Sequence, residues 1–411
     1  MIKAAILGFG VVGCGVYEVL KQNSSQIKTK CEAGIEIKYI LDIRKFPGAE
    51  YEDKVTDDFA VIENDPEIKI VIETIGGAGA AYDFTRRALE RGKHVVTSNK
   101  ELVATHGYEL LSLAEEKNVN YLFEASVGGG IPIIRPIIQC LSANEITEII
   151  GILNGTTNYI LTMMINAGMS FEQALELAKS NGYAERNPAS DIEGVDAGRK
   201  IAILASLASG HHIYPEQVVC EGIMEITLDD VRYAAEAGMV IKLLGRYKKL
   251  DGGKICVYVA PHLIGQESML SGVSGVFNGI IVRGNAVGEV MFYGRGAGDM
   301  PTASAVVADV IDAARHIDKT KNKRLWGEGG AFTQDSKVLR QRYYIRAEGA
   351  ANPAGEPSDA ERLFGRLEVI SGGTGGMSVF ITEEMDGCEF EKALDEYKKS
   401  AMVLSCMRVL G

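Results

Sequence analysis

Three glycines near the start of the chain have a spacing that suits phosphate binding. They stand directly after the apolar segment 2–7 and directly before a predicted helix over 11–22, in the stretch Gly8, Phe9, Gly10, Val11, Val12 and Gly13. In such a strand–turn–helix unit, glycines permit a tight turn and let a pyrophosphate approach the backbone at the helix N-terminus. Because the pattern lies in this context, we expect a nicotinamide dinucleotide to bind here.

The residues after the second predicted strand, 35–41, leave the choice of dinucleotide open. Asp42 could accept a hydrogen bond from a ribose hydroxyl, which would favour NAD. Arg44 could pair with a 2′-phosphate, which would favour NADP. Thr74, which follows a third predicted strand over 68–72, is expected to border the same cofactor. The sequence therefore predicts NAD or NADP without choosing between them.

Two lysines are candidates for proton transfer. Lys100 lies between a predicted strand over 94–97 and a predicted helix over 110–117, at the sheet edge where ligands of open α/β sheets bind. Lys200 lies four residues after Asp196, on the same face of a predicted helix that continues as an apolar segment. Either lysine could instead be an ordinary surface charge, but a lysine in a partly buried cleft can donate or accept a proton.

Two further stretches of small residues each have two interpretations. Three successive glycines at 128–130 could present backbone carbonyls to a cation or form an interdomain hinge, and the residues alone favour the hinge. The segment 154–158 places small polar side chains at a predicted strand–helix junction. There, Thr156 or Thr157 could contact a substrate or simply cap the helix.

The order of predicted elements divides the chain into three domains. Strands alternate with helices over 1–135, which predicts a doubly wound parallel sheet of the Rossmann type. Residues 136–325 have an α+β pattern, and we expect this domain to carry catalysis and dimerisation, with a helix over 302–317 packing back on the first domain. Pro301 suits the start of that helix. The tail, 340–411, has the order β-α-β-β-α-β, which predicts a ferredoxin-like domain.

Composition excludes several classes of partner. The chain has 411 residues and a net charge of −12, which argues against binding to nucleic acid or to an anionic membrane. It contains no apolar run long enough to span a membrane, and its start does not resemble a signal peptide, so we expect a cytoplasmic protein. The seven cysteines are scattered without a C-x-x-C pair, which predicts neither a zinc site nor a disulfide framework.

Taken together, the motifs closely resemble those of homoserine dehydrogenases. The resemblance covers residue 1 to about 320, and it is most specific in the segments 95–100, 124–132, 154–158, 182–185 and 294–298. It implies an NAD(P)-dependent oxidoreductase that interconverts L-aspartate 4-semialdehyde and L-homoserine on the route to threonine and methionine. The chemistry fits, because hydride transfer to an aldehyde leaves an oxygen that needs a proton and nearby positive charge.

The resemblance also implies roles for individual residues. Lys200 would donate the proton to the aldehyde oxygen, and Lys100 would help to bind cofactor and substrate and share in proton transfer. The substrate and the catalytic lysine would be held by Glu185, at the amino group, and by Asp191, Asp196 and Thr156. The loop at Gly298 would close over the cofactor. A sodium ion would be bound by the carbonyl oxygens of Glu124, Val127, Gly129 and Ile131.

The tail is similar to a regulatory ACT domain, which in related enzymes can respond to threonine. The usual effector loop is replaced by residues 348–355, so the tail is expected to serve either regulation or oligomer contacts in a homodimer or a dimer of dimers. Two other functions are the alternatives. One is a non-catalytic regulator that senses a dinucleotide. The other is another semialdehyde-handling oxidoreductase such as aspartate-semialdehyde dehydrogenase, but that enzyme needs a nucleophilic cysteine, and Cys140 lies in an apolar stretch.

Overall fold

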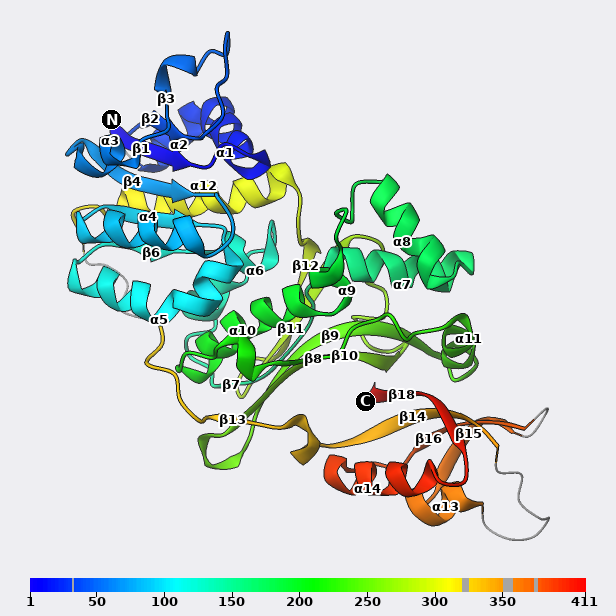
Figure 1. The fold of residues 1–411 in the computed structure, drawn as a ribbon. Coiled ribbons are helices and arrows are strands. Elements are labelled where there is room, and N and C mark those ends of the chain that lie inside the picture. Colours follow the sequence, from blue (N-terminus) through cyan, green and yellow to red (C-terminus); the bar gives the residue numbers. More distant parts are fainter. Residues whose placement is uncertain (32, 320–324, 350–357, 373–375) are drawn as a thin grey trace. The chain divides into compact units, whose positions relative to one another are not determined.

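The computed structural model describes residues 1–411 apart from 32, 320–324, 350–357 and 373–375 (Figure 1). The chain forms two compact units. The first contains Met1–Thr147, Ala202–Glu216 and Arg283–Ala331, and the second contains Glu148–Ile201, Gln217–Val282 and Phe332–Gly411. Within the ranges described, no helix combines the length and the apolar character needed to cross a membrane.

The first unit is built on a six-stranded parallel sheet with the order β3-β2-β1-β4-β5-β6. Its strands are β1 (Ile2–Leu7), β2 (Ile35–Leu41), β3 (Val55–Thr56), β4 (Ile68–Glu73), β5 (His94–Thr97) and β6 (Tyr121–Leu122). This is the strand order of doubly wound dinucleotide-binding sheets, so the Rossmann-type sheet predicted from the sequence is confirmed.

Helices cover the sheet of the first unit. They are α1 (Val11–Gln22), α2 (Ser24–Cys31), α3 (Phe59–Asn64), α4 (Gly79–Glu90), α5 (Lys100–Glu116), α6 (Ala125–Gly128) and α12 (Asp299–Arg315), and the strand β12 (Gly288–Arg295) precedes α12. On β1, Ala4 and Ile6 share one core with α1, α2 and α12 (Figure 1). Ala5 and Leu7 are equally buried and point to the opposite face, because side chains alternate along a strand.

Two helix starts differ from the sequence prediction. The helix α5 begins at Lys100 and not near residue 110, because the Asn99 side chain accepts a hydrogen bond from the backbone N–H of Leu102 and caps the helix. Lys100 is therefore the first helical residue and not a loop residue. The helix α12 begins at Asp299, so Pro301 is its third residue and does not open it.

The second unit contains a mixed sheet in which β11, β7, β9, β10, β18, β14, β16 and β15 follow one another. The longer strands are β7 (Ile146–Ile152), β9 (Met239–Lys249), β10 (Ile255–Gly265), β11 (Phe277–Gly284), β14 (Arg340–Glu348), β15 (Leu367–Gly372), β16 (Met377–Thr382) and β18 (Met402–Leu410). The short strands are β8 (Val219–Cys220), β13 (Thr333–Gln334) and β17 (Met385–Asp386). The helices are α7 (Gly155–Ala167), α8 (Phe171–Ser180), α9 (Ala189–Ile192), α10 (Val195–Ser209), α11 (Leu228–Glu236), α13 (Asp359–Phe364) and α14 (Gly387–Tyr397).

The tail has the element order β14-α13-β15-β16-α14-β18, with the short strand β17 before α14. Its four long strands pair antiparallel in the order β18-β14-β16-β15. A buried ion pair, 2.8 Å between Arg346 Nε and Asp230 Oδ1, fastens β14 to α11. Most of the predicted effector loop, 348–355, lies outside the described residues.

Candidate active site

The glycine turn after β1 is tightly packed on its inner side and open on its outer side. Gly8 has a φ of +85°, and a Cβ atom on Gly13 would lie 2.2 Å from the carbonyl oxygen of Gly8. A Cβ atom on Gly10, at the N-cap of α1, would meet no atom within 4 Å. The turn therefore packs the helix against the strand and leaves its outer side accessible, as binding of a pyrophosphate requires.

Thr74 at the end of β4 holds this turn in place. Its hydroxyl lies 2.7 Å from the carbonyl oxygen of Gly8 and 3.1 Å from that of Leu7. A Cβ atom on Gly13 would also lie 3.0 Å from the Thr74 hydroxyl oxygen. The Thr74 side chain thus packs against the glycine turn and holds it through these contacts.

Asp42 and Arg44 form a pair at the end of β2. Asp42 accepts hydrogen bonds from the backbone N–H of Phe9, at 2.8 Å, and from the guanidinium and backbone of Arg44. The hydrogen bonds from Arg44 lower the pKa of Asp42 to about 2, so the carboxylate is ionised at neutral pH. Arg44 also donates to the carbonyl oxygen of Phe9 at 2.8 Å, and its side chain remains 56% exposed. A solvent-facing guanidinium is therefore fixed beside the glycine turn.

A buried carboxyl group joins the carboxyl ends of β4 and β5. Glu73 accepts hydrogen bonds from the backbone N–H of Ile75, at 2.7 Å, and from the hydroxyl of Thr97. The Thr97 hydroxyl in turn accepts from the backbone N–H of Asn99, which caps the helix that begins at Lys100. Burial raises the pKa of Glu73. This network sets where α5 begins and therefore where the Lys100 backbone lies.

The segment after β6 is folded around another buried carboxylate. Glu124 accepts from the backbone N–H groups of Ile133, Ile134 and Arg135 at 2.7–2.8 Å. The carboxylate is engaged in this way, whereas the predicted contact with a sodium ion is made by the carbonyl oxygen of Glu124. Gly129 has a φ of +55°, and a Cβ atom there would lie 2.4 Å from the carbonyl oxygen of Gly296. The turn that would carry the sodium-binding carbonyls therefore packs against the loop that precedes Gly298.

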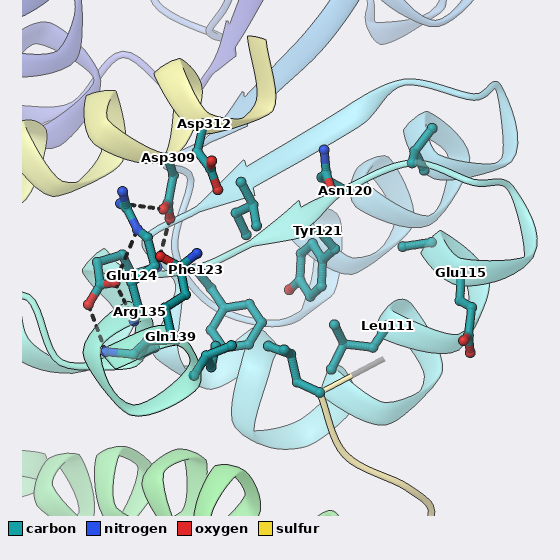
Figure 2. Close-up of a pocket in the computed structure, with 16 residues that line it drawn as sticks. Leu111, Glu115, Asn120, Tyr121, Phe123, Glu124, Arg135, Gln139, Asp309 and Asp312 are labelled. Atoms are coloured by element: carbon teal, nitrogen blue, oxygen red, sulfur yellow. Dashed lines mark hydrogen bonds and ion pairs between the residues drawn. The ribbon is translucent and has the colours of Figure 1, made fainter. Parts of the chain in front are cut away.

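Asp309 on α12 ties the same segment to the helix that follows this loop. Asp309 accepts from the backbone N–H of Glu124 and from the guanidinium of Arg135, both at 2.7 Å (Figure 2). The three residues border a small cavity of about 40 Å³, which also contacts Tyr121 (Figure 2). This volume has room for one or two water molecules and not for an amino-acid substrate.

In the second unit, Lys200 has the buried position that the sequence predicts. Its residue exposure is 7%, and its ammonium lies 2.8 Å from the Asp196 carboxylate and 2.8 Å from the carbonyl oxygen of Leu153. The spacing of four residues places both side chains on one face of α10. The pair is therefore a buried ion pair and not a surface one.

Asn154 connects this pair to a second carboxylate. Its side-chain amide donates to Asp191, at 2.7 Å, and to Asp196, at 2.8 Å. Its side-chain oxygen accepts from the backbone N–H of Thr157, so Asn154 caps α7. Of the two interpretations of this segment, a cap from Thr156 or Thr157 does not hold, because the helix already begins at Gly155.

Thr156 is buried in the first turn of α7. Its hydroxyl donates to the carbonyl oxygen of Tyr183 at 2.6 Å, which fastens α7 to the segment that leads into Glu185. Glu185 is exposed on that segment.

The structure thus gathers the predicted residues into two groups. The predicted cofactor residues, Lys100 and the predicted sodium ligands belong to the first unit, and Lys200, Asp191, Asp196, Thr156 and Glu185 belong to the second. Sequence reasoning missed Asn154 and Glu73 as site residues. An asparagine just before a helix and a carboxylate ending an apolar strand were the available signals.

A parallel sheet of the doubly wound order, an open glycine turn and a buried lysine–aspartate pair define the class of protein, an NAD(P)-dependent oxidoreductase. Residues 8–124 match the family described as "Homoserine dehydrogenase, NAD binding domain", and residues 132–311 match the family described as "Homoserine dehydrogenase".

Individual relatives agree with these matches. The chain is 39% identical to a homoserine dehydrogenase of Pseudomonas aeruginosa over 86% of this chain and 83% of the relative. A homoserine dehydrogenase structure from Thiobacillus denitrificans superposes with a TM-score of 0.92 at 33% identity, over 100% of this chain and 98% of the other. A hyperthermophilic archaeal homoserine dehydrogenase in complex with NADPH superposes with a TM-score of 0.65 at 28% identity, over 78% of this chain and 99% of the other. The chain belongs to the homoserine dehydrogenase family, whose members interconvert L-aspartate 4-semialdehyde and L-homoserine.

Proposed function

We propose that Lys200 transfers the proton in this reaction. During aldehyde reduction its ammonium donates a proton to the carbonyl oxygen, and during homoserine oxidation the neutral amine accepts the proton of the hydroxyl. The observation that carries this proposal is the buried ammonium, which Asp196 and the Leu153 carbonyl hold in one position. The bound nicotinamide supplies or accepts the hydride.

Other residues of the same unit would bind the substrate. Glu185, exposed and negatively charged, would bind the amino group. Asp191 and Asp196, joined through Asn154, would position the substrate and Lys200. Thr156 would shape the floor of the site through its bond to Tyr183. Lys100, at the start of α5, would contact cofactor and substrate and share in proton transfer.

The cofactor we propose is NADP, bound on the turn Gly8–Gly13 with Gly298 closing over it. Both oxygens of Asp42 already accept hydrogen bonds from Arg44 or Phe9, so a ribose hydroxyl would have to compete for them. The exposed Arg44 guanidinium is suited to a 2′-phosphate through its positive charge and its Nη1 group, since Nε and Nη2 already donate to Asp42 and Phe9. NAD would bind to the same turn without this contact.

We also propose a sodium ion at the glycine-containing turn after β6. Hard cations prefer neutral and anionic oxygen ligands, and the glycines let backbone carbonyls converge. The carbonyl oxygens that would bind it are those of Glu124, Val127, Gly129 and Ile131. In this position the ion would stabilise the turn that packs against Gly296.

We further propose the domain limits 1–135, 136–325 and 340–411, with the tail as an ACT-type domain. The antiparallel strand order β18-β14-β16-β15 supports the ferredoxin-like character of the tail. The homodimer or dimer of dimers stays a prediction.

Replacing Lys200 by methionine tests the proposed function. We expect kcat for homoserine oxidation to fall by about 10²–10⁴, the usual contribution of a general acid or base, while NADP still binds. The matched control is Lys179→Met on α8, which removes a surface ion pair with Glu176 and should leave kcat unchanged. A Lys200→Met variant with the wild-type kcat would refute the proposed role.

A further inference from the structure

A second buried lysine lies in the unit that carries Lys200, and the proposed mechanism does not use it. Lys242 on β9 is 2% exposed. Its ammonium donates to the carbonyl oxygen of Val273 at 2.6 Å and to the side-chain oxygen of Asn158 at 3.2 Å. Within the described part of the chain, both of its hydrogen-bond acceptors are neutral oxygens. A buried ammonium that lacks a carboxylate partner is costly and requires an explanation.

One of the two oxygens that Lys242 contacts, the Val273 carbonyl, belongs to a loop of residues 273–277, and the other belongs to Asn158, whose amide contacts the same loop. The Asn158 amide lies 3.2, 3.0 and 3.0 Å from the carbonyl oxygens of Val273, Gly275 and Phe277. An amide nitrogen has only two hydrogens, so three carbonyls exceed what it can fully satisfy. The loop therefore gathers excess partial negative charge, and the Lys242 ammonium is the positive charge that balances it.

This loop lies against the first turn of α7. A Cβ atom on Gly155 would lie 2.9 Å from the carbonyl oxygen of Val276. The Thr162 hydroxyl, two turns into α7 in sequence, accepts from the backbone N–H of Gly275 at 3.0 Å and donates to the carbonyl oxygen of Asn158 at 2.6 Å. The loop is thus fastened to α7 near its start and again near its middle.

The first turn of α7 is also where the proposed substrate site begins. Asn154 caps that turn and donates to Asp191 and Asp196, and Thr156 stands in it. Any shift of the loop 273–277 would move Gly155 and, with it, its two neighbours, Asn154 and Thr156.

We propose that Lys242 is a positioning residue of the substrate site, and that its buried ammonium acts as a tethered cation that holds the loop 273–277 on α7 and so fixes Asn154 and Thr156. This inference rests on the proposed function, because it assumes that these two residues serve homoserine. Burial lowers the pKa of Lys242 to about 8, which agrees with the lack of a carboxylate partner.

The first test removes the positive charge of Lys242 while keeping most of the volume of its side chain. Lys242→Met keeps most of the length of the side chain, which becomes one heavy atom shorter, and removes its charge and its donors. We expect the KM for homoserine to rise about tenfold and the KM for NADP and kcat to change less than about threefold. The matched control is Lys249→Met on the same strand, a half-buried lysine outside this cluster, which should leave both KM values unchanged.

Chemical rescue tests whether Lys242 acts through its positive charge or only through the volume of its side chain. Lys242→Ala removes the equivalent of n-propylammonium, so adding n-propylammonium should restore the KM for homoserine, whereas the neutral n-propanol should not. Lys242→Met, whose side chain fills the space, should not respond to either compound. Equal rescue by both compounds would mean that Lys242 only fills space, and would overturn the proposal.

A further variant keeps the inference testable if the lysine variants do not fold. Thr162→Val removes the hydroxyl that holds Gly275 while keeping the shape of the side chain, and it should raise the KM for homoserine in the same direction. An unchanged KM for homoserine in this variant would overturn the proposal. The proposed function and the role of Lys242 can fail separately. Absence of homoserine oxidation by the wild-type enzyme contradicts the proposed function. A normal wild-type rate, together with variants whose KM for homoserine is unchanged, contradicts only the role of Lys242.

Discussion

Asn154 has two separable tasks, and substitutions can test them one at a time. Its oxygen caps α7, and its amide donates to the carboxylates of Asp191 and Asp196. Asn154→Ala removes both tasks. Asn154→Ser keeps the cap, because serine caps helices about as well as asparagine, but its single hydroxyl cannot reach two carboxylates.

The expected magnitudes follow from these contacts. Loss of a cap costs about 1 kcal/mol of unfolding free energy. Removing the amide donor of the buried Asp196 carboxylate costs about 2 kcal/mol more, within the usual range for a hydrogen bond to a charged group. We therefore expect a loss of about 3 kcal/mol for Asn154→Ala and about 2 kcal/mol for Asn154→Ser.

Activity should respond differently from stability. Both variants release Asp196, which holds the Lys200 ammonium, so both should lose about 10²-fold in kcat/KM, since a misplacement of about 1 Å has that effect. The assays are urea unfolding and the initial rate of homoserine-dependent NADP reduction. The control is Asp58→Ala, which removes the cap of α3 in the first unit and should cost about 1 kcal/mol without a kinetic effect. Wild-type kinetics in Asn154→Ser would refute the claim that this amide sets the position of Lys200.

Three further predictions concern other contacts. Burial opposes ionisation of Asp230, but hydrogen bonds from Arg346 and Thr227 outweigh it and lower the pKa of Asp230. The stabilisation is therefore fully present above the ordinary value of 3.8 and is lost as the pH falls through the folded-state pKa. Asp230→Asn should destabilise by about 3 kcal/mol at pH 7 and by less in acid, as measured by urea unfolding at each pH, and an equal loss at all pH values would contradict this. Arg44→Ala should raise the KM for NADP about tenfold and the KM for NAD less than twofold, and parallel changes would argue against a 2′-phosphate contact. Glu73→Leu should cost about 2 kcal/mol in urea unfolding, because the Ile75 N–H and the Thr97 hydroxyl lose their acceptor, and unchanged stability would contradict the network.

Local patterns were sufficient to predict the parallel sheet and the glycine turn of the nucleotide-binding unit. The turn Gly8–Gly13 is a contiguous motif whose glycines act within one strand–helix unit, so its backbone requirements can be read directly. The four-residue spacing of Asp196 and Lys200 likewise fixed their shared helix face, and the structure confirms their ion pair. The apolar residues that follow Lys200 in the same helix favoured the prediction that this pair is partly buried.

Helix starts and caps were not predicted correctly where they depend on contacts between residues that are distant in sequence. The start of α5 at Lys100 depends on Asn99 and on the Thr97–Glu73 contact, which joins residues 24 positions apart. The cap of α7 is Asn154 and not Thr156 or Thr157, which the sequence had offered as one alternative, and the Asn154 amide is held by carboxylates 37 and 42 residues away. No local propensity contains that information.

The sequence by itself determined the chemistry of the protein: a glycine turn for a dinucleotide, an ordered set of motifs typical of one enzyme family, and a lysine one helical turn from an aspartate. Only the tertiary structure decided which polar groups hold these parts in place. The roles of Asn154, Glu73 and Lys242 arise because buried polar groups must find partners, and the available partners are determined by how distant strands and loops pack together.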